Sequence, residues 1–465
     1  MIRVHDVLRD VPSFESFCSV EKLHRLVDGV RADPRFSVEE VGTSVNGVPI
    51  HHLRYGQGAV RALVVAGPHA PEAVGGLTVF SLITLLQQRH PGLANADVEW
   101  HIVPCIDPDG AILNEGWSLA PFSIANYRRH FYLQSPRDQV DTSFPVSHKK
   151  LLLNAPSQEA KILRGVIDRS RPDFFFTLHN ASFGGAFCFV NRDIGQPYYT
   201  QIHQLVRDQG LVMQAKPLWK EMCAPYAQGI VEMWTVRKYY DFLEKTSPSP
   251  EKSIHYGAGS WDYVEEVNPG ALVFVTEAGY VRHPRESSNA DTGQNLRQFL
   301  LRLDADRRYL GSMLVEEWDK IKDQVDTASP FYRATVDGRL IPTREDLVDG
   351  KARLSRYPMS DALFNPDYAR NMTEADRVSA CLDAVYFLTV RSQVIRLLKA
   401  SPQTQAICLA AERLERAFEE ALDQLDRLID FSAMESISHG TLARVQLGSG
   451  LVALNSLLAQ QGHRA

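Results

Sequence analysis

Apolar residues in the first two thirds of the chain follow two alternating patterns. Near-continuous apolar runs, as expected for strands that are covered on both faces, occupy 62–66, 172–178 and 271–276. Between them, 75–88 and 157–170 have the spacing and the length of helices. The alternation predicts an α/β fold over residues 1–310, with a sheet that is flanked by helices on both faces.

The pattern changes after residue 310. Segment 311–370 has little periodicity and predicts an irregular linker or insertion, and its prolines are Pro330, Pro342, Pro358 and Pro366. Residues 371–465 have helical periodicity throughout and predict a C-terminal helical bundle. Its three helices are expected at about 373–399, 403–430 and 438–461.

Two local signals support the predicted bundle. Thr373, followed three residues later by Asp376, is typical of a helix N-terminus. In the second helix, apolar residues with three- and four-residue spacing share one face, and they are Leu414, Phe418, Leu422, Leu425 and Leu428. These helices predict a bundle that packs on the rest of the chain or on a second copy, as a homo-oligomer. An alternative is that the bundle or residues 331–368 cover an active-site cleft.

Side chains that can bind a metal ion or act as a general base follow three of the predicted strands. His69 and Glu72 follow 62–66, His179 follows 172–178, and Glu277 follows 271–276. Two histidines and one carboxylate, with an open fourth position, are a common ligand set of catalytic zinc. A further glutamate near such a site is suited to act as the general base for water. The ligands are far apart in the sequence, so the fold has to assemble this site.

Several phrases of the chain resemble, in the same order, those of the zinc carboxypeptidases, the M14 metallopeptidase family. They are the hairpin Val41-Gly42-Thr43-Ser44-Val45-Asn46-Gly47-Val48-Pro49-Ile50, the ligand pair His69-x-x-Glu72, the turn Asp107-Pro108-Asp109-Gly110, His179 after an apolar strand, and Ser260-Trp261-Asp262 ahead of Glu277. The resemblance covers about residues 36–285. It implies a mixed sheet, one Zn²⁺ held by His69, Glu72 and His179, and Glu277 as the catalytic glutamate.

The chain departs from the family where substrate is bound. Pro71 stands before the ligand Glu72, where the family often has a basic residue. The family's Asn-Arg pair, which holds the substrate's terminal carboxylate, has its best match in Arg128 and Arg129. By this resemblance Arg129 binds the carboxylate, and Arg128 is a candidate to polarise the scissile carbonyl. Tyr256 is the candidate for the tyrosine that closes over substrate, two residues out of register.

Each of these residues also has a structural interpretation. His179 alone would suit a core histidine, and Glu277 a strand-end carboxylate, although a glutamate after six apolar residues is costly unless it is used or paired. Arg128 and Arg129 alone would suit surface charges. The combination of His69, Glu72 and His179 favours the metal site over these alternatives.

Composition narrows the setting. The chain has 465 residues, 44% of them apolar, and a net charge of −6 with both signs dispersed, which gives no nucleic-acid footprint. We expect no signal peptide and no membrane span. We also expect no disulfide, because the six cysteines are scattered without CxxC spacing. The expected setting is therefore cytoplasmic.

Three functions are compatible with these residues. The first is a zinc carboxypeptidase that acts on short peptides or a peptide-like metabolite. The second is a zinc amidase or deacylase on the same scaffold, which acts on an acylated amino acid or a biosynthetic intermediate. The third is a non-catalytic binding protein, which would have no need of all four of His69, Glu72, His179 and Glu277.

Overall fold

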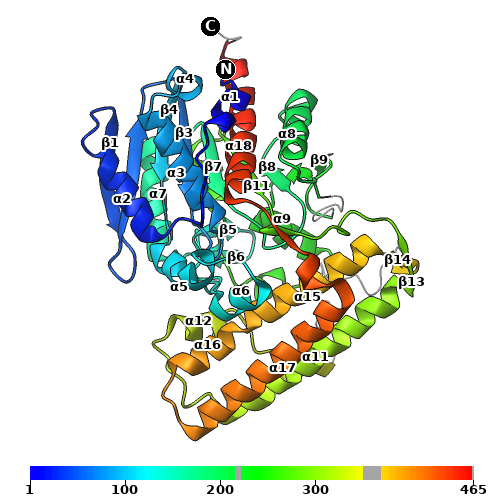
Figure 1. Ribbon diagram of the computed structural model, residues 1–465. Coiled ribbons are helices and arrows are strands. Elements are labelled where there is room, and N and C mark those ends of the chain that lie inside the picture. The colour runs from blue at the N-terminus through cyan, green and yellow to red at the C-terminus, as the bar shows by residue number, and fades with distance from the viewer. Residues whose placement is uncertain (215–220, 349–367, 463–465) are drawn as a thin grey trace. The chain divides into compact units, whose positions relative to one another are not determined.

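A nine-stranded mixed sheet is the centre of the computed structural model, which describes residues 1–214, 221–348 and 368–462 (Figure 1). The strand order is β1-β2-β4-β3-β7-β11-β8-β10-β9. The strands, in chain order, are β1 (Phe36–Thr43), β2 (Pro49–Tyr55), β3 (Val60–Ala66), β4 (Val98–Val103), β7 (Phe174–Leu178), β8 (Phe187–Val190), β9 (Pro225–Ala227), β10 (Ile230–Glu232) and β11 (Leu272–Glu277).

The four strands β4, β3, β7 and β11 run parallel in the middle of the sheet. Their side chains are buried on both faces, which explains the near-continuous apolar runs of the sequence. β3 connects to β4 on one side, whereas β7 lies on the other side of β3. The chain therefore changes direction between β3 and β7, and such a switch point leaves a crevice beyond the carboxyl ends of the strands.

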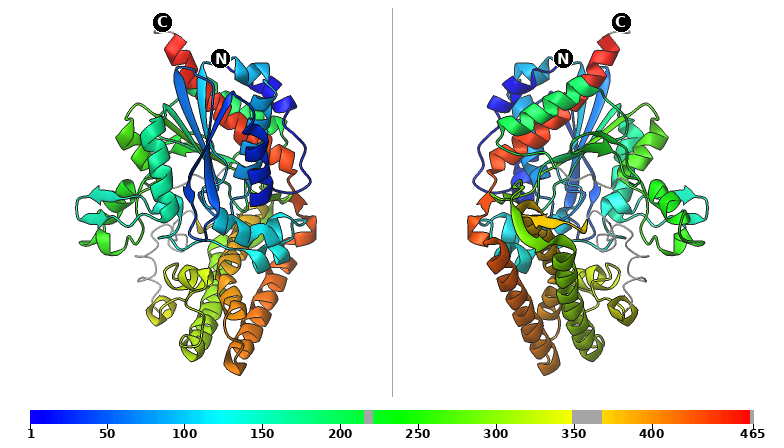
Figure 2. Two further views of the ribbon diagram at one scale, coloured as in Figure 1. Left: turned by 90° about the vertical axis from the view of Figure 1, so that its left-hand side faces the viewer. Right: turned by 90° about the vertical axis from the view of Figure 1, so that its right-hand side faces the viewer.

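Helices cover both faces of this sheet (Figure 2). The helices α3 (Val74–Gln87), α8 (Gln196–Asp208) and α18 (His439–Gly462) pack together on one face. On the other face, α7 (Gln158–Ser170), α9 (Val236–Glu244) and α10 (Ser260–Val267) enclose a core with the facing side chains of β3, β7 and β11. The predicted α/β fold with a mixed, doubly covered sheet is thus confirmed.

The remaining elements around the sheet are short. They are α1 (Val4–Arg9), α2 (Val20–Val30), α4 (Pro91–Ala94), α5 (Pro108–Ser118), η1 (Val140–Thr142), η2 (Pro250–Lys252) and the hairpin of β5 (Val146–His148) and β6 (Leu151–Leu153). All six cysteines are free, and Cys105, Cys188, Cys223 and Cys381 are buried, as the sequence predicted.

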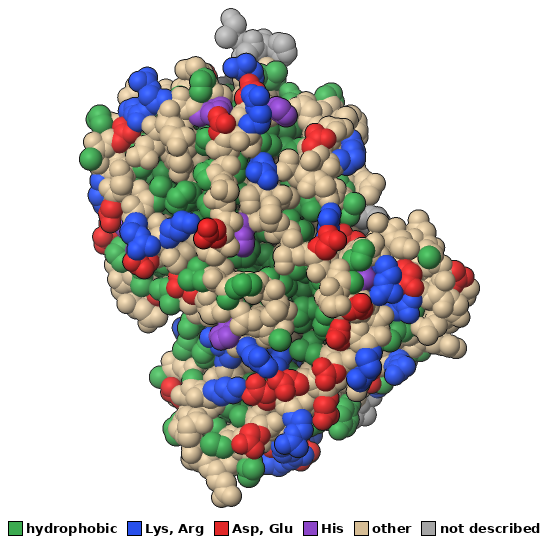
Figure 3. Space-filling view, in the orientation of Figure 1, with side chains coloured by type: hydrophobic (Ala, Val, Ile, Leu, Met, Phe, Trp, Pro, Cys, Tyr) green, Lys and Arg blue, Asp and Glu red, His purple; other side chains and the backbone are tan. Residues whose placement is uncertain are grey.

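A second unit is mostly helical. Its helices are α6 (Ile124–His130), α11 (Leu296–Ile321), α12 (Pro330–Val336), α13 (Arg344–Val348), α15 (Glu374–Arg391), α16 (Gln393–Ala400), α17 (Gln405–Ile429) and the short η5 (Phe431–Ala433). Two small strand pairs belong to it, β12 (Val281–Arg282) with β15 (Glu435–Ser436) and β13 (Asp291–Asn295) with β14 (Asn371–Thr373). Side chains of both charge signs are interspersed on its surface (Figure 3).

The chain divides differently from the sequence-based boundaries at residues 310 and 370. The sheet unit comprises Met1–Pro121, Pro136–Tyr280 and Ile437–Ala465, and the helical unit comprises Phe122–Ser135 and Val281–Ser436. The prediction of one helical domain over 371–465 is therefore wrong in its boundaries. The physical reason is that α18 buries its apolar side chains against the sheet rather than against the other C-terminal helices.

Of two other predicted features, the cap at Thr373 is confirmed and the irregular segment is not. Thr373 caps α15, where its hydroxyl accepts from the Asp376 N–H and the Asp376 carboxylate accepts from the Thr373 N–H. The predicted irregular segment 311–370 instead contains the end of α11 together with α12 and α13, and its residues 349–367 lie outside the described part of the chain.

The expectation that the chain has no membrane span stays a prediction. Glu374–Ala400 and His439–Gln460 are long and apolar enough to cross a membrane, by length and composition. However, 67% and 83% of their apolar windows are buried inside the molecule. Core helices of soluble proteins have the same property, so the two stretches are weak evidence for a membrane.

Candidate metal centre

The loop after β3 carries the first two predicted ligands. Gly67 has a φ of +69°, a conformation that glycine adopts without strain, and it turns the chain out of the strand. The Glu72 N–H then donates to the His69 carbonyl at 3.1 Å, so the two residues share one tight turn. This turn places His69 Nδ1 at 2.9 Å from Glu72 Oε1.

The third predicted ligand arrives from the neighbouring strand. His179 directly follows β7, and its Nδ1 lies 2.9 Å from Glu72 Oε2. Its side chain is almost fully buried. The ligand atoms of His69, Glu72 and His179 all lie within 4.8 Å of one another, and no other such group of three occurs among the described residues.

This donor set suits zinc. Two imidazole nitrogens and a carboxylate are borderline ligands that bind Zn²⁺ at about 2.0–2.2 Å, and three protein ligands leave the fourth position open, as in catalytic sites. The ligand atoms lie within 4.8 Å of one another, so small side-chain movements would bring all three onto one such ion. The Nδ1 atoms of both histidines face the Glu72 carboxylate, so the three groups converge on one point without any change of fold.

Asp141 orients His179 through Nε2, the imidazole nitrogen that does not face Glu72. It lies in η1 and has no exposed surface. One of its oxygens is 3.0 Å from His179 Nε2 and accepts from the Thr177 hydroxyl at 3.0 Å, while the other accepts from the Ser260 N–H at 3.3 Å. A carboxylate on the second nitrogen of a ligating imidazole fixes its tautomer and raises its basicity. Asp141 was not predicted from the sequence, because no local sequence pattern marks a single aspartate in a turn as a site residue.

Two further residues hold the loop that carries Glu72. The Tyr280 hydroxyl donates to the Pro71 carbonyl at 2.5 Å and accepts from the Ala73 N–H at 3.1 Å. The Asn180 N–H donates to Glu72 Oε2 at 3.3 Å, and its side-chain oxygen accepts from the first N–H of α3 at 3.0 Å. The sequence offered one hint of this arrangement, since Asn180 directly follows His179.

The charges of these groups are strongly coupled. Burial alone would lower the pKa of His179, but the adjacent carboxylates of Glu72 and Asp141 outweigh it and raise that pKa well above its usual value. Burial would also raise the pKa of Glu72, yet His69 and His179 hold it well below the usual range. The two carboxylates therefore stay ionised and stabilise positive charge at the point where the ligand atoms meet.

Glu277 stands at the carboxyl end of β11, close enough for Glu72 and His179 to act on its charge. Its side chain is half-buried. Burial and the negative charge of Glu72 raise the pKa of Glu277 to about 8, although His179 acts in the opposite direction. The described part of the chain offers no lysine or arginine among the groups that shift this pKa.

Two aromatic residues of the predicted site lie in the sheet unit. The Tyr256 ring is stacked with that of Tyr239 at a centroid distance of 6.4 Å and is tilted against Trp234 at 6.0 Å. The Trp261 ring is buried and lies edge-on to His179 at 6.2 Å. Tyr256 thus belongs to an aromatic cluster, and its role in closing over substrate stays a prediction.

The two predicted substrate arginines belong to the helical unit. Arg128 is buried on α6, where it donates to the Ser392 hydroxyl at 3.4 Å and lies 3.5 Å from Glu419. Arg129 is half-exposed and donates to the same Glu419 oxygen at 3.1 Å. Both guanidinium groups therefore already have a carboxylate partner, and carboxylate binding by Arg128 or Arg129 stays a prediction.

Comparison with known families supports the resemblance drawn from the motifs. The family model described as zinc carboxypeptidase, Peptidase_M14, matches residues 24–192. This segment contains His69, Glu72, Asp141 and His179. The resemblance to the M14 zinc carboxypeptidases is therefore confirmed over these residues, and with it a relationship to a family of zinc hydrolases.

Solved structures with a similar chain path include two bacterial metallo-carboxypeptidases. The enzyme from Burkholderia cenocepacia is 17% identical, with a TM-score of 0.36, over 56% of this chain and 60% of that one. The enzyme from Pseudomonas aeruginosa, in complex with (2-guanidinoethylmercapto)succinic acid, gives the same identity, TM-score and coverage. The match thus spans less than two thirds of either structure. A search of curated proteins found no match.

Proposed function

We propose that this chain is a zinc-dependent hydrolase that cleaves an amide bond next to a free carboxylate, in short peptides or a peptide-like metabolite. The observation that carries the proposal is the meeting of two histidines and a glutamate from separate strand ends, with Glu277 beside them. A metal site that catalyses hydrolysis needs a general base besides its ligands, and Glu277 is a glutamate outside the set of three ligands.

Zinc, when bound, would polarise the scissile carbonyl and make water acidic enough to attack near neutral pH. Glu277, whose ionised form the charge of the bound ion would favour, would accept a proton from the attacking water and deliver it to the departing nitrogen. Asp141 would keep His179 Nε2 protonated, so that Nδ1 remains the free ligand atom. Tyr280 and Asn180 would keep Glu72 in place during these steps.

A second function is favoured by the charges around the site. An amidase or deacylase whose leaving group lacks a carboxylate needs no cation there. Arg128 and Arg129 are both engaged by Glu419. A carboxypeptidase would require one of them, or another cation, to release this partner and bind the substrate.

The test compares N-acylated dipeptides with a free and with an amidated C-terminal carboxylate, on the wild type and on Glu277→Gln. We expect the free acids to be cleaved and the amides to be resistant, with Glu277→Gln about 10²–10⁴-fold slower because the proton acceptor is lost. Equal turnover of both substrates would favour the amidase or deacylase. Glu277→Gln with wild-type turnover would contradict the proposed role of this carboxylate.

We also propose a reducing, cytoplasmic setting. Six free cysteines, with no disulfide among the described residues, are the ordinary state of proteins in compartments that keep thiols reduced. Burial raises the pKa of the Cys18 and Cys223 thiols to about 11, so these thiols are poor nucleophiles. Fractionation of the source cells with an antibody against this chain would test the location.

A further inference from the structure

The strands that carry His179 and Glu277 separate just before they reach the metal centre. β7 and β11 pair through Phe174 to Phe176 and Leu272 to Phe274, and their ladder ends there. His179 and Thr276 therefore lie beyond the last residues that the two strands pair. A buried carbonyl that has no partner costs about 1–3 kcal/mol, so these ends need another donor.

Gln446 of α18 supplies this donor to both strands. Its side-chain nitrogen donates to the His179 carbonyl at 2.5 Å and to the Thr276 carbonyl at 3.4 Å. Its side-chain oxygen accepts from the Thr78 hydroxyl of α3 at 2.6 Å, which fixes the orientation of the amide. Gln446 and Thr78 are both buried, at 3% and 0% exposure, so water does not compete for these bonds.

A close approach of α18 to the sheet makes this reach possible. Gly450 lies one helical turn after Gln446, on the same side of the helix. A Cβ atom at Gly450 would come within 2.2 Å of the Phe176 ring, so only glycine lets the helix backbone lie directly on β7. The same turn of α18 therefore combines a contact with β7 and an amide that donates to the carbonyl of His179, directly after that strand.

We propose that Gln446 is a positioning residue for the metal centre. It sets the separation of the β7 and β11 ends, and thereby the placement of the ligand His179 relative to the base Glu277. Gln446 lies outside residues 24–192, which match the family model. The inference rests on the proposed function for its catalytic meaning, but the tie between the two strands can be tested without metal.

The first measurement is amide hydrogen exchange on the metal-free protein, wild type and Gln446→Met. Methionine has a similar length but donates no hydrogen bond. We expect the amides of 177–181 and 275–279 to exchange faster in the variant, with the rest of the sheet unchanged. The matched control is Asn455→Leu, which removes another buried amide of α18 that bonds the backbone of Ile2, far from the strand ends.

The second measurement is the dissociation constant for Zn²⁺, by competition with a chromophoric chelator. We expect Gln446→Met to bind zinc about 10-fold more weakly, at the lower end of the range for residues that orient metal ligands. Thr78→Val retains Gln446 but frees its amide, so we expect a smaller effect in the same direction, and we expect Thr78→Ser to restore wild-type affinity. The Thr78 variants also decide the matter if Gln446→Met does not fold.

The outcomes separate this inference from the proposed function. Unchanged exchange at both strand ends in Gln446→Met would overturn the inference, as would an equal loss of zinc affinity in Asn455→Leu. Faster exchange with unchanged zinc affinity would also overturn it, because the tie would then be structural only. Wild-type protein that binds no zinc would refute the proposed function, and the exchange data would still decide whether Gln446 holds the two strands together.

Discussion

At the scale of single residues, the metal centre depends on a row in which histidines and carboxylates alternate. Glu72 lies between His69 and His179, and His179 lies between Glu72 and Asp141. Each carboxylate of this row lies within hydrogen-bonding distance of at least one imidazole. Removing one member leaves its neighbour buried and unpaired, which is usually more costly than the pair itself is stabilising.

Asp141→Asn tests the part of this row behind His179. The amide cannot accept from His179, Thr177 and Ser260 as the two carboxylate oxygens do. We expect zinc affinity to fall about 10–100-fold, the usual loss when a residue that orients a metal ligand is removed. The measurement is competition with a chromophoric chelator.

Asp173→Asn is the matched control for Asp141→Asn. Asp173 is a carboxylate directly before β7, at the end of that strand opposite His179, and it is paired with Arg61 at 2.9 Å. This variant loses part of an ion pair but touches no residue of the metal centre. Equal zinc affinity in Asp141→Asn and wild type, with both proteins folded, would contradict the role given to Asp141.

Asp262 makes the free energy of unfolding depend on pH. Burial raises the pKa of Asp262 to about 7, above the usual value of 3.8, although the Gly259 N–H donates to it at 3.0 Å. The folded state therefore keeps a proton that the unfolded state releases, so this group's contribution falls as pH rises from about 4 to about 7. The steepest loss is about 1.4 kcal/mol per pH unit.

The measurement is urea unfolding of the wild type and Asp262→Asn at several pH values between about 5 and about 8. The neutral amide has no proton to lose, so the free energy of unfolding of the wild type should decline relative to the variant as pH rises. A constant difference between the two proteins across this range would contradict the raised pKa of Asp262.

At the scale of elements, the sequence predicts the helices and strands whose apolar residues are periodic or form continuous runs. β3, β7 and β11 were predicted because strands covered on both faces are continuous apolar runs, and the ligands because they follow directly after these runs. Asp141 was missed because it lies in a turn, and Gln446 because it is one polar residue in an apolar helix. Both act through distant segments, and only the folded chain shows such contacts.

Gly450→Ala tests the seating of α18 on the sheet. The added methyl group would overlap the Phe176 ring, so we expect the free energy of unfolding to fall by about 1–3 kcal/mol. The control is Gly440→Ala in the same helix, where the added group meets only the flexible end of Arg444, and where alanine should stabilise by up to about 1 kcal/mol. Thermal or urea unfolding measures both.

A double variant tells steric overlap from helix propensity. Phe176→Leu removes part of the ring that the Gly450→Ala methyl group would meet, so the loss in the double variant should be smaller than the sum of the two single losses. Strict additivity would contradict the close contact between α18 and β7.

At the scale of the whole molecule, the chain builds two units that interrupt one another. It leaves the sheet unit after Tyr280 and re-enters it at Ile437, whose N–H donates to the Tyr280 carbonyl at 3.0 Å. Deleting 371–465 would therefore remove α18 from the core of the sheet unit as well as α15, α16, α17 and η5 of the other unit. Unfolding, rather than a broader range of substrates, is the expected result of that truncation.

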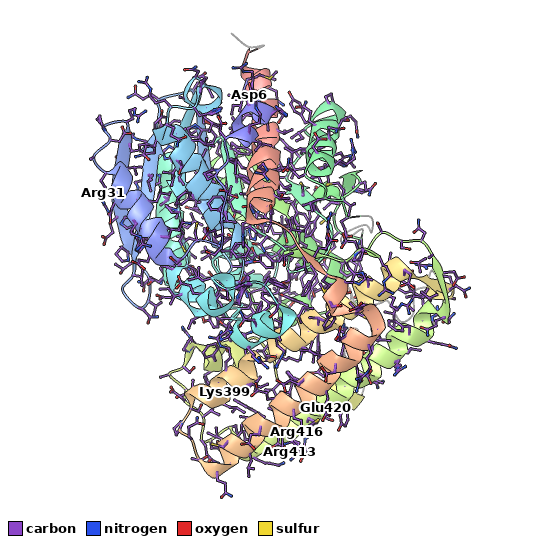
Figure 4. The ribbon with its side chains drawn as sticks, viewed as in Figure 1. Asp6, Arg31, Lys399, Arg413, Arg416 and Glu420 are labelled. Atoms are coloured by element: carbon purple, nitrogen blue, oxygen red, sulfur yellow. The ribbon has the colours of Figure 1, made fainter. Side chains whose placement is uncertain are left out.

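The helical unit is stabilised by contacts among its own helices. Arg413, Arg416 and Glu420 project from α17 (Figure 4), and Arg413 donates to Glu317 of α11 at 2.6 Å. Leu414, Phe418, Leu422 and Leu425 are buried on one face of α17, as their spacing predicted, whereas Leu428 is only half-buried and Ile429 takes the last buried position. The role of this unit as an oligomer interface stays a prediction.

The metal content of the purified protein is the direct test of the proposed zinc site. The measurement is elemental analysis of purified wild type beside His179→Gln, with His148→Gln as the control, because His148 pairs with Asp241 outside the metal centre. We expect about one equivalent of zinc in the wild type and the control, and little in His179→Gln. Folded wild type that holds no metal after zinc is added back would contradict the hydrolase and leave a non-catalytic binding protein.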